Sequence, residues 1–211
     1  MRLQITILGG SIGALALSHM ILDKYPKYNV RIIEEKAEIG FPQEGAGICF
    51  DPSYVSLLHS WGVSELASFQ QSNWNGKEIV GCIRGWVEKC LALSFVTRGG
   101  LLTLRTRVER DDEELLLFGA GTRESRLYSD EIIDLRAPHC ITEWTGQISP
   151  MPIDGGWLRG DGNWESWVLS DRYSQSDKAV EVVKSFASDF HHLTIDYQID
   201  LARAALSNFK A

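Results

Sequence analysis

The start of the chain constrains its fold more than any other segment. An apolar β-type run over residues 3–8 continues into a glycine-rich turn at Gly9, and a small-residue helix is expected over residues 12–24. A second β-type run, 30–33, follows and ends in Glu34. This succession of strand, turn, helix, strand and terminal acid is typical of a βαβ unit that binds a dinucleotide. We therefore predict adjacent parallel strands over 2–8 and 30–34, joined by a right-handed helical crossover.

Each residue of the turn has a physical role in that interpretation. A glycine at position 9 permits a tight turn, and positions 10 and 11 leave room for a diphosphate to approach the backbone. Positions 13 and 14 let the helix pack close to the strand, and the helix N-terminus offers free N–H groups and a positive dipole end to phosphates. The candidate diphosphate-binding residues are Gly9, Gly10, Ser11, Ile12, Gly13 and Ala14.

The acid at the end of the second strand indicates the kind of dinucleotide. Glu34 is placed to accept hydrogen bonds from ribose hydroxyls, and no arginine is expected nearby in the adenosine pocket. This favours an unphosphorylated ribose, as in FAD or NAD, over NADP. Ser11 departs from the glycine pattern, because it adds a Cβ and a hydroxyl where the diphosphate would lie. A βαβ unit that binds nothing is the structural alternative.

The segment after the second strand extends the pattern. Residues 38–52 read Glu-Ile-Gly-Phe-Pro-Gln-Glu-Gly-Ala-Gly-Ile-Cys-Phe-Asp-Pro and lead into a helix expected over 53–61. Together with the turn and the run ending in Glu34, this opening resembles the aromatic-hydroxylase class of FAD-dependent monooxygenases over residues 1–63. Geranylgeranyl-reductase-like flavoproteins share much of it, including the step from Ile39 to Pro42. The resemblance implies FAD as the cofactor, with NAD(P)H as the electron donor if the protein is redox-active.

The resemblance also assigns two charged positions that face the cofactor. The family has a Glu-Arg pair after the second strand, whereas this chain has Glu34-Glu35, so a cation near the adenosine diphosphate is lost. Arg98 is similar to the arginine of the family's Arg-x-x-Leu step, which faces the FAD diphosphate, although a surface arginine fits equally well. Both Glu35 and Arg98 are therefore candidate cofactor-binding residues.

Beyond residue 63 the resemblance thins. The family's Gly-Ala-Asp-Gly step, which contacts both cofactors, is replaced around Asp134 to Ala137, where both glycines are absent. Family members are also considerably longer, and their C-terminal part closes the flavin site. We therefore expect FAD binding to be weak or absent relative to a full-length member.

The rest of the chain predicts strands followed by helices. Residues 77–88 and 91–97 are β-rich, 115–118 and 125–133 are expected to form a hairpin, and 176–190 and 200–209 are expected to be helices. Residues 141–172 are expected to form antiparallel strands, with Gly160-Asp161-Gly162 as a turn between two of them. Four tryptophans in this region form either an aromatic wall over a flat substrate or ordinary sheet packing: Trp144, Trp157, Trp164 and Trp167.

These patterns together predict an α/β protein. A Rossmann-like FAD-binding βαβ domain is expected over 1–135, and an antiparallel β-sheet subdomain of the substrate-covering type is expected over 136–211. The net charge of −7 and the lack of a basic stripe argue against a nucleic-acid partner. No apolar run is long enough to span a membrane, and the early first strand leaves no place for a signal peptide, so we expect a cytoplasmic protein.

Cysteine spacing gives no metal site. Cys49, Cys82, Cys90 and Cys140 form no C-x-x-C pair, and no histidine or aspartate completes a ligand set. Reduced thiols are expected, and the resemblance would place Cys49 near a bound flavin.

Three functions fit the sequence. The first is an FAD-dependent monooxygenase acting on a small organic substrate, aromatic or polycyclic. The second is a non-redox isomerase or cyclase that kept the fold but lost tight FAD binding. The third is a non-catalytic subunit, with a homodimer or a partner chain completing the site. Fold alone does not choose among them.

Overall fold

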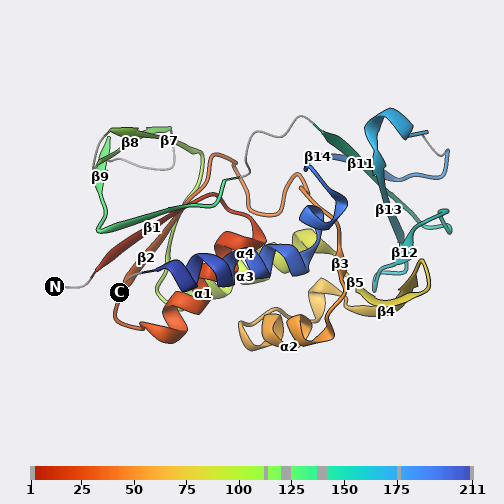
Figure 1. Cartoon of the computed structure of the whole chain (residues 1–211), viewed down its shortest axis with the longest axis horizontal. Coiled ribbons are helices and arrows are strands. Elements are labelled where there is room, and N and C mark those ends of the chain that lie inside the picture. The colour runs from red at the N-terminus through yellow and green to blue at the C-terminus, as the bar shows by residue number, and fades with distance from the viewer. Residues whose placement is uncertain (1–2, 112–113, 120–124, 137–141, 175–176, 210–211) are drawn as a thin grey trace. The chain divides into compact units, whose positions relative to one another are not determined.

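The computed structural model describes residues 3–111, 114–119, 125–136, 142–174 and 177–209 (Figure 1). The chain divides into two compact units, and each is assembled from separate segments. Unit 1 comprises Met1–Ile39, Leu91–Ala137 and Ile199–Ala211, and unit 2 comprises Gly40–Cys90 and Pro138–Gln198. The two units alternate along the sequence, because residues 40–90 belong to unit 2 and residues 199–211 belong to unit 1.

A four-stranded parallel sheet forms the centre of unit 1. Its strand order is β10-β1-β2-β6, with β1 at Gln4–Leu8, β2 at Asn29–Ile33, β6 at Leu101–Thr103 and β10 at Glu131–Asp134. Strand β1 pairs in parallel with β2 on one side and with β10 on the other. The last four residues of β1 are buried, as expected for a central parallel strand that is covered on both faces. The predicted adjacency of the first two strands is confirmed.

The crossover between β1 and β2 is helix α1, Ile12–Lys24, which lies against these strands (Figure 1). It begins at Ser11, whose side-chain oxygen accepts a hydrogen bond from the Ala14 N–H. Ten of its residues are buried, so its small and aliphatic side chains pack on nearly every side. The helix matches the predicted range of 12–24.

A second sheet of unit 1 packs on the first. It comprises β7 (Thr106–Asp111), β8 (Glu114–Gly119) and β9 (Arg126–Tyr128), all antiparallel. Its inward residues share one hydrophobic cluster with the parallel sheet: Leu8, Ile33, Val108, Leu115 and Leu117, with Leu127 and Ile132 against it. The pairing of β8 with β9 confirms the first part of the predicted hairpin. Residues 131–134 instead join the parallel sheet as β10.

Unit 2 contains two antiparallel sheets. The first has the order β3-β5-β4, with β3 at Ile48–Cys49, β5 at Lys77–Gly81 and β4 at Gln70–Trp74. The second has the order β12-β13-β11-β14, with β12 at Trp157–Leu158, β13 at Trp164–Leu169, β11 at Glu143–Ser149 and β14 at Glu181–Phe186. The antiparallel strands expected within 141–172 are confirmed, and so is the turn at residues 160–162 between β12 and β13.

Four helices, α1 to α4, occur among the described residues. Helix α2, Pro52–Ser60, confirms the helix expected after the opening segment, and α4, Ile195–Asn208, confirms the one expected at 200–209. Strand β5 confirms the β-rich interpretation over residues 77–81, and helix α3, Arg84–Thr97, corrects it over the rest of that region. Val87, Leu91 and Phe95 are buried at intervals of four residues, which is a helical period that their β-type composition concealed.

The prediction of a helix over 176–190 is also wrong. Strand β14 occupies its centre and pairs antiparallel with β11. Its burial alternates, with Val183 and Ser185 inward and their neighbours outward. Pairing with a distant strand therefore overrides the local helical pattern.

Candidate functional site

The glycine-rich turn lies at the carboxyl end of β1 in unit 1. Gly9 has a φ of +100°, a conformation that favours glycine, and its N–H donates to the Ile33 carbonyl at 2.9 Å. The next N–H, that of Gly10, donates to Oε2 of Glu34 at 2.5 Å. The turn after β1 is thus tied to the residues that end β2.

The carboxylate of Glu34 is fixed at this position by two backbone donors. Its Oε1 accepts a hydrogen bond from the Lys36 N–H at 2.9 Å, while Oε2 accepts the bond from Gly10. A carboxylate has about four lone-pair directions, so each oxygen keeps capacity to accept a further bond. The free lone pairs of Glu34 can accept hydrogen bonds from two neighbouring ribose hydroxyls.

The space beside Gly10 is too small for a side chain. A Cβ added to Gly10 would lie 2.4 Å from Cδ1 of Ile39 and 2.8 Å from Oε2 of Glu34. Only a residue without a side chain leaves both neighbours in place. The glycine at this position therefore preserves the location of the carboxylate as well as the turn.

The N-terminus of α1 offers donors beside this carboxylate. Ser11 Oγ accepts the Ala14 N–H at 3.4 Å, and the Ser11 carbonyl accepts the Leu15 N–H at 3.0 Å. Within the described ranges, the N–H groups of Ser11 and Ile12 have no hydrogen-bond partner. The hydroxyl of Ser11 thus caps the helix, and two amides remain for an anion at the positive end of the helix dipole.

A cation also lies near this edge of the sheet, although the sequence places it far from Glu34. Arg136, just after β10, donates through Nε and Nη2 to the two carboxylate oxygens of Asp134, at 2.9 and 2.5 Å. Hydrogen bonds to Asp134 raise the pKa of Arg136, and the charge of Glu35 raises it further. An arginine that lies about a hundred residues from Glu35 in the sequence is therefore near it in space.

Arg98 lies elsewhere in unit 1. Its guanidinium donates to Oδ1 of Asp23 at 2.5 Å and contacts Nδ1 of His19 at 2.8 Å. Both partners belong to the second half of α1, and Asp23 lies roughly 16 Å along the helix from Ile12 at 1.5 Å per residue. The structure thus does not bring Arg98 together with the glycine-rich turn.

The four tryptophans of unit 2 do not share one environment. Trp157 and Trp167 are buried in the hydrophobic core of unit 2, and Trp144 packs against the same core. Their indole N–H groups donate to the Gly47 carbonyl, to Glu165 and to the Ala187 carbonyl, respectively. Trp164 is half-buried and opposes Ser149 across the strand pair, on the other side of the pleat from Trp167. Trp144, Trp157 and Trp167 are therefore part of ordinary sheet packing.

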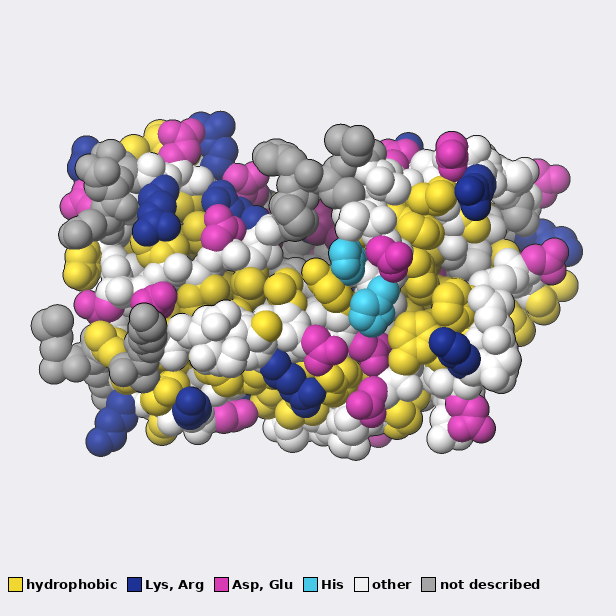
Figure 2. All heavy atoms as spheres, in the orientation of Figure 1, with side chains coloured by type: hydrophobic (Ala, Val, Ile, Leu, Met, Phe, Trp, Pro, Cys, Tyr) yellow, Lys and Arg dark blue, Asp and Glu magenta, His cyan; other side chains and the backbone are white. Residues whose placement is uncertain are grey.

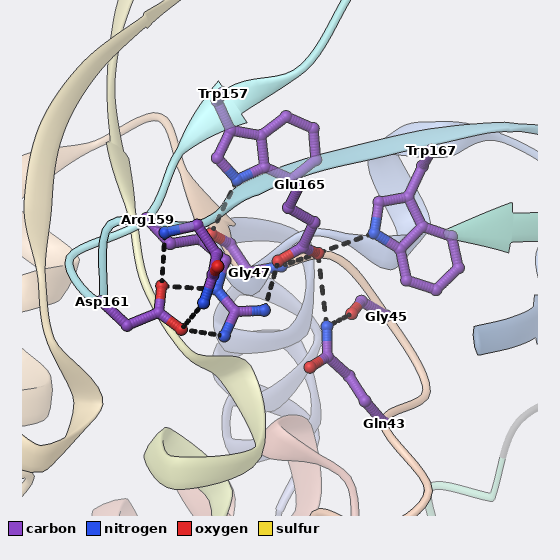
Figure 3. Close-up of polar contacts among 9 residues, drawn as sticks. Gln43, Gly45, Gly47, Trp157, Arg159, Asp161, Glu165 and Trp167 are labelled. Atoms are coloured by element: carbon purple, nitrogen blue, oxygen red, sulfur yellow. Dashed lines mark hydrogen bonds and ion pairs between the residues drawn. The ribbon is translucent and has the colours of Figure 1, made fainter. Parts of the chain in front are cut away.

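A buried carboxylate in unit 2 was missed by sequence reasoning. Glu165, on β13, is fully buried, and its Oε1 accepts N–H bonds from Gly47 at 2.8 Å and Trp167 at 2.7 Å (Figure 3). The Gln43 side chain donates to the same oxygen at 3.3 Å and to the Gly45 carbonyl at 2.8 Å. Glu165 thus fastens the segment 43–47 to β13. A charged residue inside the apolar run Trp164–Leu169 was the available signal.

The other carboxylate oxygen faces an arginine. Arg159 Nη1 lies 3.6 Å from Oε2 of Glu165, and Arg159 Nη2 pairs with Asp161 at 2.7 Å. Burial raises the pKa of Glu165 above its usual range, against the opposing effects of Arg159 and of the donors on Oε1. This cluster joins three segments of unit 2 and packs beside Trp157 and Trp167 (Figure 3).

The cysteines in the described residues are free thiols. Cys49 and Cys82 are buried, and burial raises the pKa of both, so neither is a ready nucleophile. Cys140 lies outside the described residues. Within the described part of the chain, no group of three or more His, Cys, Asp or Glu is arranged to hold a metal ion.

The described surface carries mixed charge. On the face drawn in Figure 2, Lys and Arg side chains are dispersed among Asp and Glu, and they form no continuous basic area. Among the described helices, none combines the length and the apolar character that a bilayer span requires.

Comparison with known proteins identifies the fold. No family model and no curated protein matches the sequence. Among solved structures, the halogenase PltM in complex with ethyl mercury and mercury aligns with a TM-score of 0.62 and 10% identity, over 97% of this chain and 67% of that one. A geranylgeranyl bacteriochlorophyll reductase-like protein from Thermoplasma acidophilum aligns with a TM-score of 0.57 and 10% identity, over 86% and 65%.

CtdE in complex with FAD aligns with a TM-score of 0.54 and 11% identity, over 83% of this chain and 62% of that one. The chain spans about two thirds of the length of each of these three structures. At such identities the likeness concerns the fold. The chain shares the α/β fold of the halogenase, the geranylgeranyl reductase-like protein and CtdE, which is a fold of the kind that its opening predicted.

Proposed function

We propose that the chain binds FAD through unit 1 and acts as a flavin-dependent oxidoreductase of the monooxygenase type. Its substrate would be a small organic molecule, aromatic or polycyclic, and NAD(P)H would be the electron donor. The observation that carries the proposal is the Glu34 carboxylate, held 2.5 Å from the Gly10 N–H beside the start of α1. This arrangement sets acceptors for ribose hydroxyls next to donors for a diphosphate.

The residues present fit the adenosine diphosphate half of FAD. Glu34 would hold the ribose, and the N–H groups of Ser11 and Ile12 would face the diphosphate. When bound, FAD supplies the electron transfer and the oxygen chemistry, while the protein binds and orients it. The chain's own contribution in unit 1 is to fix donors and acceptors in place before the cofactor arrives.

A second candidate function rests on the segment after β10. The backbone there runs through Leu135 and Arg136 instead of glycines, and its N and O atoms would lie 3.2 Å from a Cβ built on Gly9. This leaves less freedom for close approach of a cofactor to the backbone. Weak FAD binding with non-redox catalysis, as in an isomerase or cyclase, or a site completed by a partner chain, is therefore the alternative.

One set of measurements separates these functions. The purified protein is examined by absorbance before and after denaturation, and then titrated with FAD while flavin fluorescence is followed. We expect saturable binding of FAD that is weak enough to be lost on extensive dialysis, followed by substrate-dependent oxidation of NAD(P)H by the loaded protein. Saturable binding without such oxidation would favour the non-redox function or a missing partner, and no binding of FAD would reject the proposal.

A further inference from the structure

Arg136 occupies a distinctive place in the topology of unit 1. Strand β1 lies between β10 and β2. The chain passes from β1 to β2 on one side, whereas β10, on the other side, comes from much later in the sequence. In open parallel sheets, ligands bind outside the carboxyl ends of strands at such a reversal of strand order. The glycine-rich turn follows β1 there, Glu34 follows β2, and Arg136 follows β10 by two residues.

The backbone places this arginine next to the turn. The Leu135 N–H donates to the Leu8 carbonyl at 2.9 Å, which extends the pairing of β10 with β1 up to the turn. A Cβ built on Gly9 would lie 3.2 Å from the backbone N of Arg136. The first residue of the turn and Arg136 are thus in direct backbone proximity.

The guanidinium of Arg136 is held in one orientation, and some of its N–H donors remain available for a ligand. Nε and Nη2 bond to Asp134, and Nη1 donates to the Val108 carbonyl at 3.3 Å. A guanidinium has five N–H donors, so one on Nη1 and one on Nη2 remain without a partner among the described residues. The side chain is 44% exposed. Two neighbouring donors on a fixed planar group match the oxygens of a phosphate.

The local charge favours a cation beside an anionic ligand, and Arg110 also acts electrostatically on Asp134. Glu34, Glu35 and Asp134 bring three carboxylates to this edge of the sheet, and a diphosphate approaching them alone would be repelled. The charge of Glu35 raises the pKa of Arg136, so the two groups lie within electrostatic range of each other. The positive charge that is absent from position 35 is thereby supplied in space by a residue that follows a different strand, β10.

We propose that Arg136 binds the diphosphate of the cofactor, in place of a cation on the segment after β2. Asp134 and Val108 orient the guanidinium, and its two remaining donors face the phosphate oxygens. The proposal rests on the proposed function, because it assigns a further residue to the same site. It makes no use of the flavin ring, so it is testable with nucleotides alone.

The test measures binding of FAD, ADP and adenosine to the full chain by calorimetry, at low and moderate salt. The variants are Arg136→Ala, Arg136→Lys, Glu34→Ala and, as a control, Arg126→Ala. Arg126 is an exposed arginine paired with Glu114 in the second sheet of unit 1, so its removal leaves the site intact. Circular dichroism and thermal unfolding establish that each variant is folded, and Arg136→Gln replaces the alanine variant if that one is not.

We expect Arg136→Ala to weaken ADP and FAD by tenfold or more, the range for loss of a charged hydrogen bond, and to leave adenosine unchanged. Arg136→Lys should recover part of the loss, because it keeps the charge without the planar fork. The salt dependence of ADP binding should become shallower in Arg136→Ala. Arg126→Ala should match the wild type.

Three results would overturn the proposal, and they differ in meaning. If Glu34→Ala weakens ADP and FAD but folded Arg136→Ala or Arg136→Gln binds them like the wild type, the site stands and Arg136 is not part of it. If the wild type binds neither ADP nor FAD, both the site and the role of Arg136 are wrong. An equal loss of adenosine and ADP in Arg136→Ala would also contradict a phosphate contact.

Discussion

The Gly10 N–H donates to Oε2 of Glu34 at 2.5 Å, and this bond links the ends of two adjacent parallel strands. The carboxylate is therefore fixed against the turn without any ligand. Because ordering a side chain costs free energy when a ligand binds, a group held in advance leaves more of the interaction energy for affinity. Gly10 and Glu34 are therefore positioned together at the edge of the sheet.

Replacing Glu34 with alanine tests the adenosine end of the site. The substitution removes the acceptors for ribose hydroxyls, and we expect FAD and adenosine affinity to fall by about 1.5–3 kcal/mol, the range for hydrogen bonds to a charged group. Calorimetric titration measures the change, with Glu131→Ala as the control. Glu131 is an exposed acid on β10 of the same sheet. Unchanged affinity in the folded variant would reject the assignment of Glu34.

Gly10→Ala tests the space beside Glu34. The new Cβ would come within 2.4 Å of Ile39 and 2.8 Å of the Glu34 carboxylate, so one of them must move. We expect a lower melting temperature, by a few degrees for a loss of about 1–3 kcal/mol, together with weaker ADP binding. A variant with wild-type stability and affinity would show that the turn tolerates the methyl group.

Ser11→Ala separates helix capping from ligand binding. It removes the hydroxyl that accepts the Ala14 N–H, so unfolding should become easier by about 0.5–2 kcal/mol. The backbone N–H groups that would face a diphosphate remain, and ADP affinity should change little. A large loss of ADP affinity at unchanged stability would instead place the hydroxyl in contact with the ligand. Chemical denaturation and calorimetry on the same preparation give both quantities.

The βαβ opening was predictable because its determinants are local. Strand, glycine turn, N-cap and terminal acid lie within one continuous stretch, and the structure places them as the sequence indicates. Strand β14 was not predictable in the same way. Its conformation depends on pairing with β11, which lies more than thirty residues earlier, and no local signal reports that partner.

The residues of the candidate site also differ in whether local sequence could predict them. Glu34 and the turn were found because a short motif contains both. Arg136 was missed because it reaches the turn through the parallel pairing of β10 with β1, across more than 120 residues of chain. The conformation of α3 was missed because its residues were interpreted by type, whereas the spacing of four residues between Val87, Leu91 and Phe95 indicates a helix.

Glu165→Ala tests the buried cluster of unit 2. Three N–H donors, from Gly47, Gln43 and Trp167, lose their acceptor, and Arg159 loses the fully buried one of its two carboxylate partners. Removing one partner from a buried ion pair costs about 3–5 kcal/mol, and we expect a loss of that order in the free energy of unfolding. Glu114→Ala, which breaks an exposed pair with Arg126, should cost less than about 1 kcal/mol. Equal losses in the two variants, measured by urea denaturation, would contradict a structural role for Glu165.

The pH dependence of stability offers an independent test of the same carboxyl group. Burial raises the pKa of Glu165 in the folded protein above the ordinary value of 4.5, so the folded state holds its proton more tightly than the unfolded state does. Its contribution to stability is then fully present below pH 4.5 and is lost as the pH rises through the raised pKa. Glu165→Gln keeps an oxygen for the N–H donors but cannot titrate.

The difference in unfolding free energy between wild type and Glu165→Gln should therefore shift in favour of the variant as the pH rises from about 4 to about 8. Other carboxyl groups, such as Asp134 with its pKa lowered by the hydrogen bonds from Arg136, titrate in both proteins and cancel in the difference. Urea denaturation at a series of pH values gives the two curves. A difference that is constant with pH would mean that the Arg159 guanidinium and the three N–H donors offset burial, and a shift toward the wild type would mean that they outweigh it.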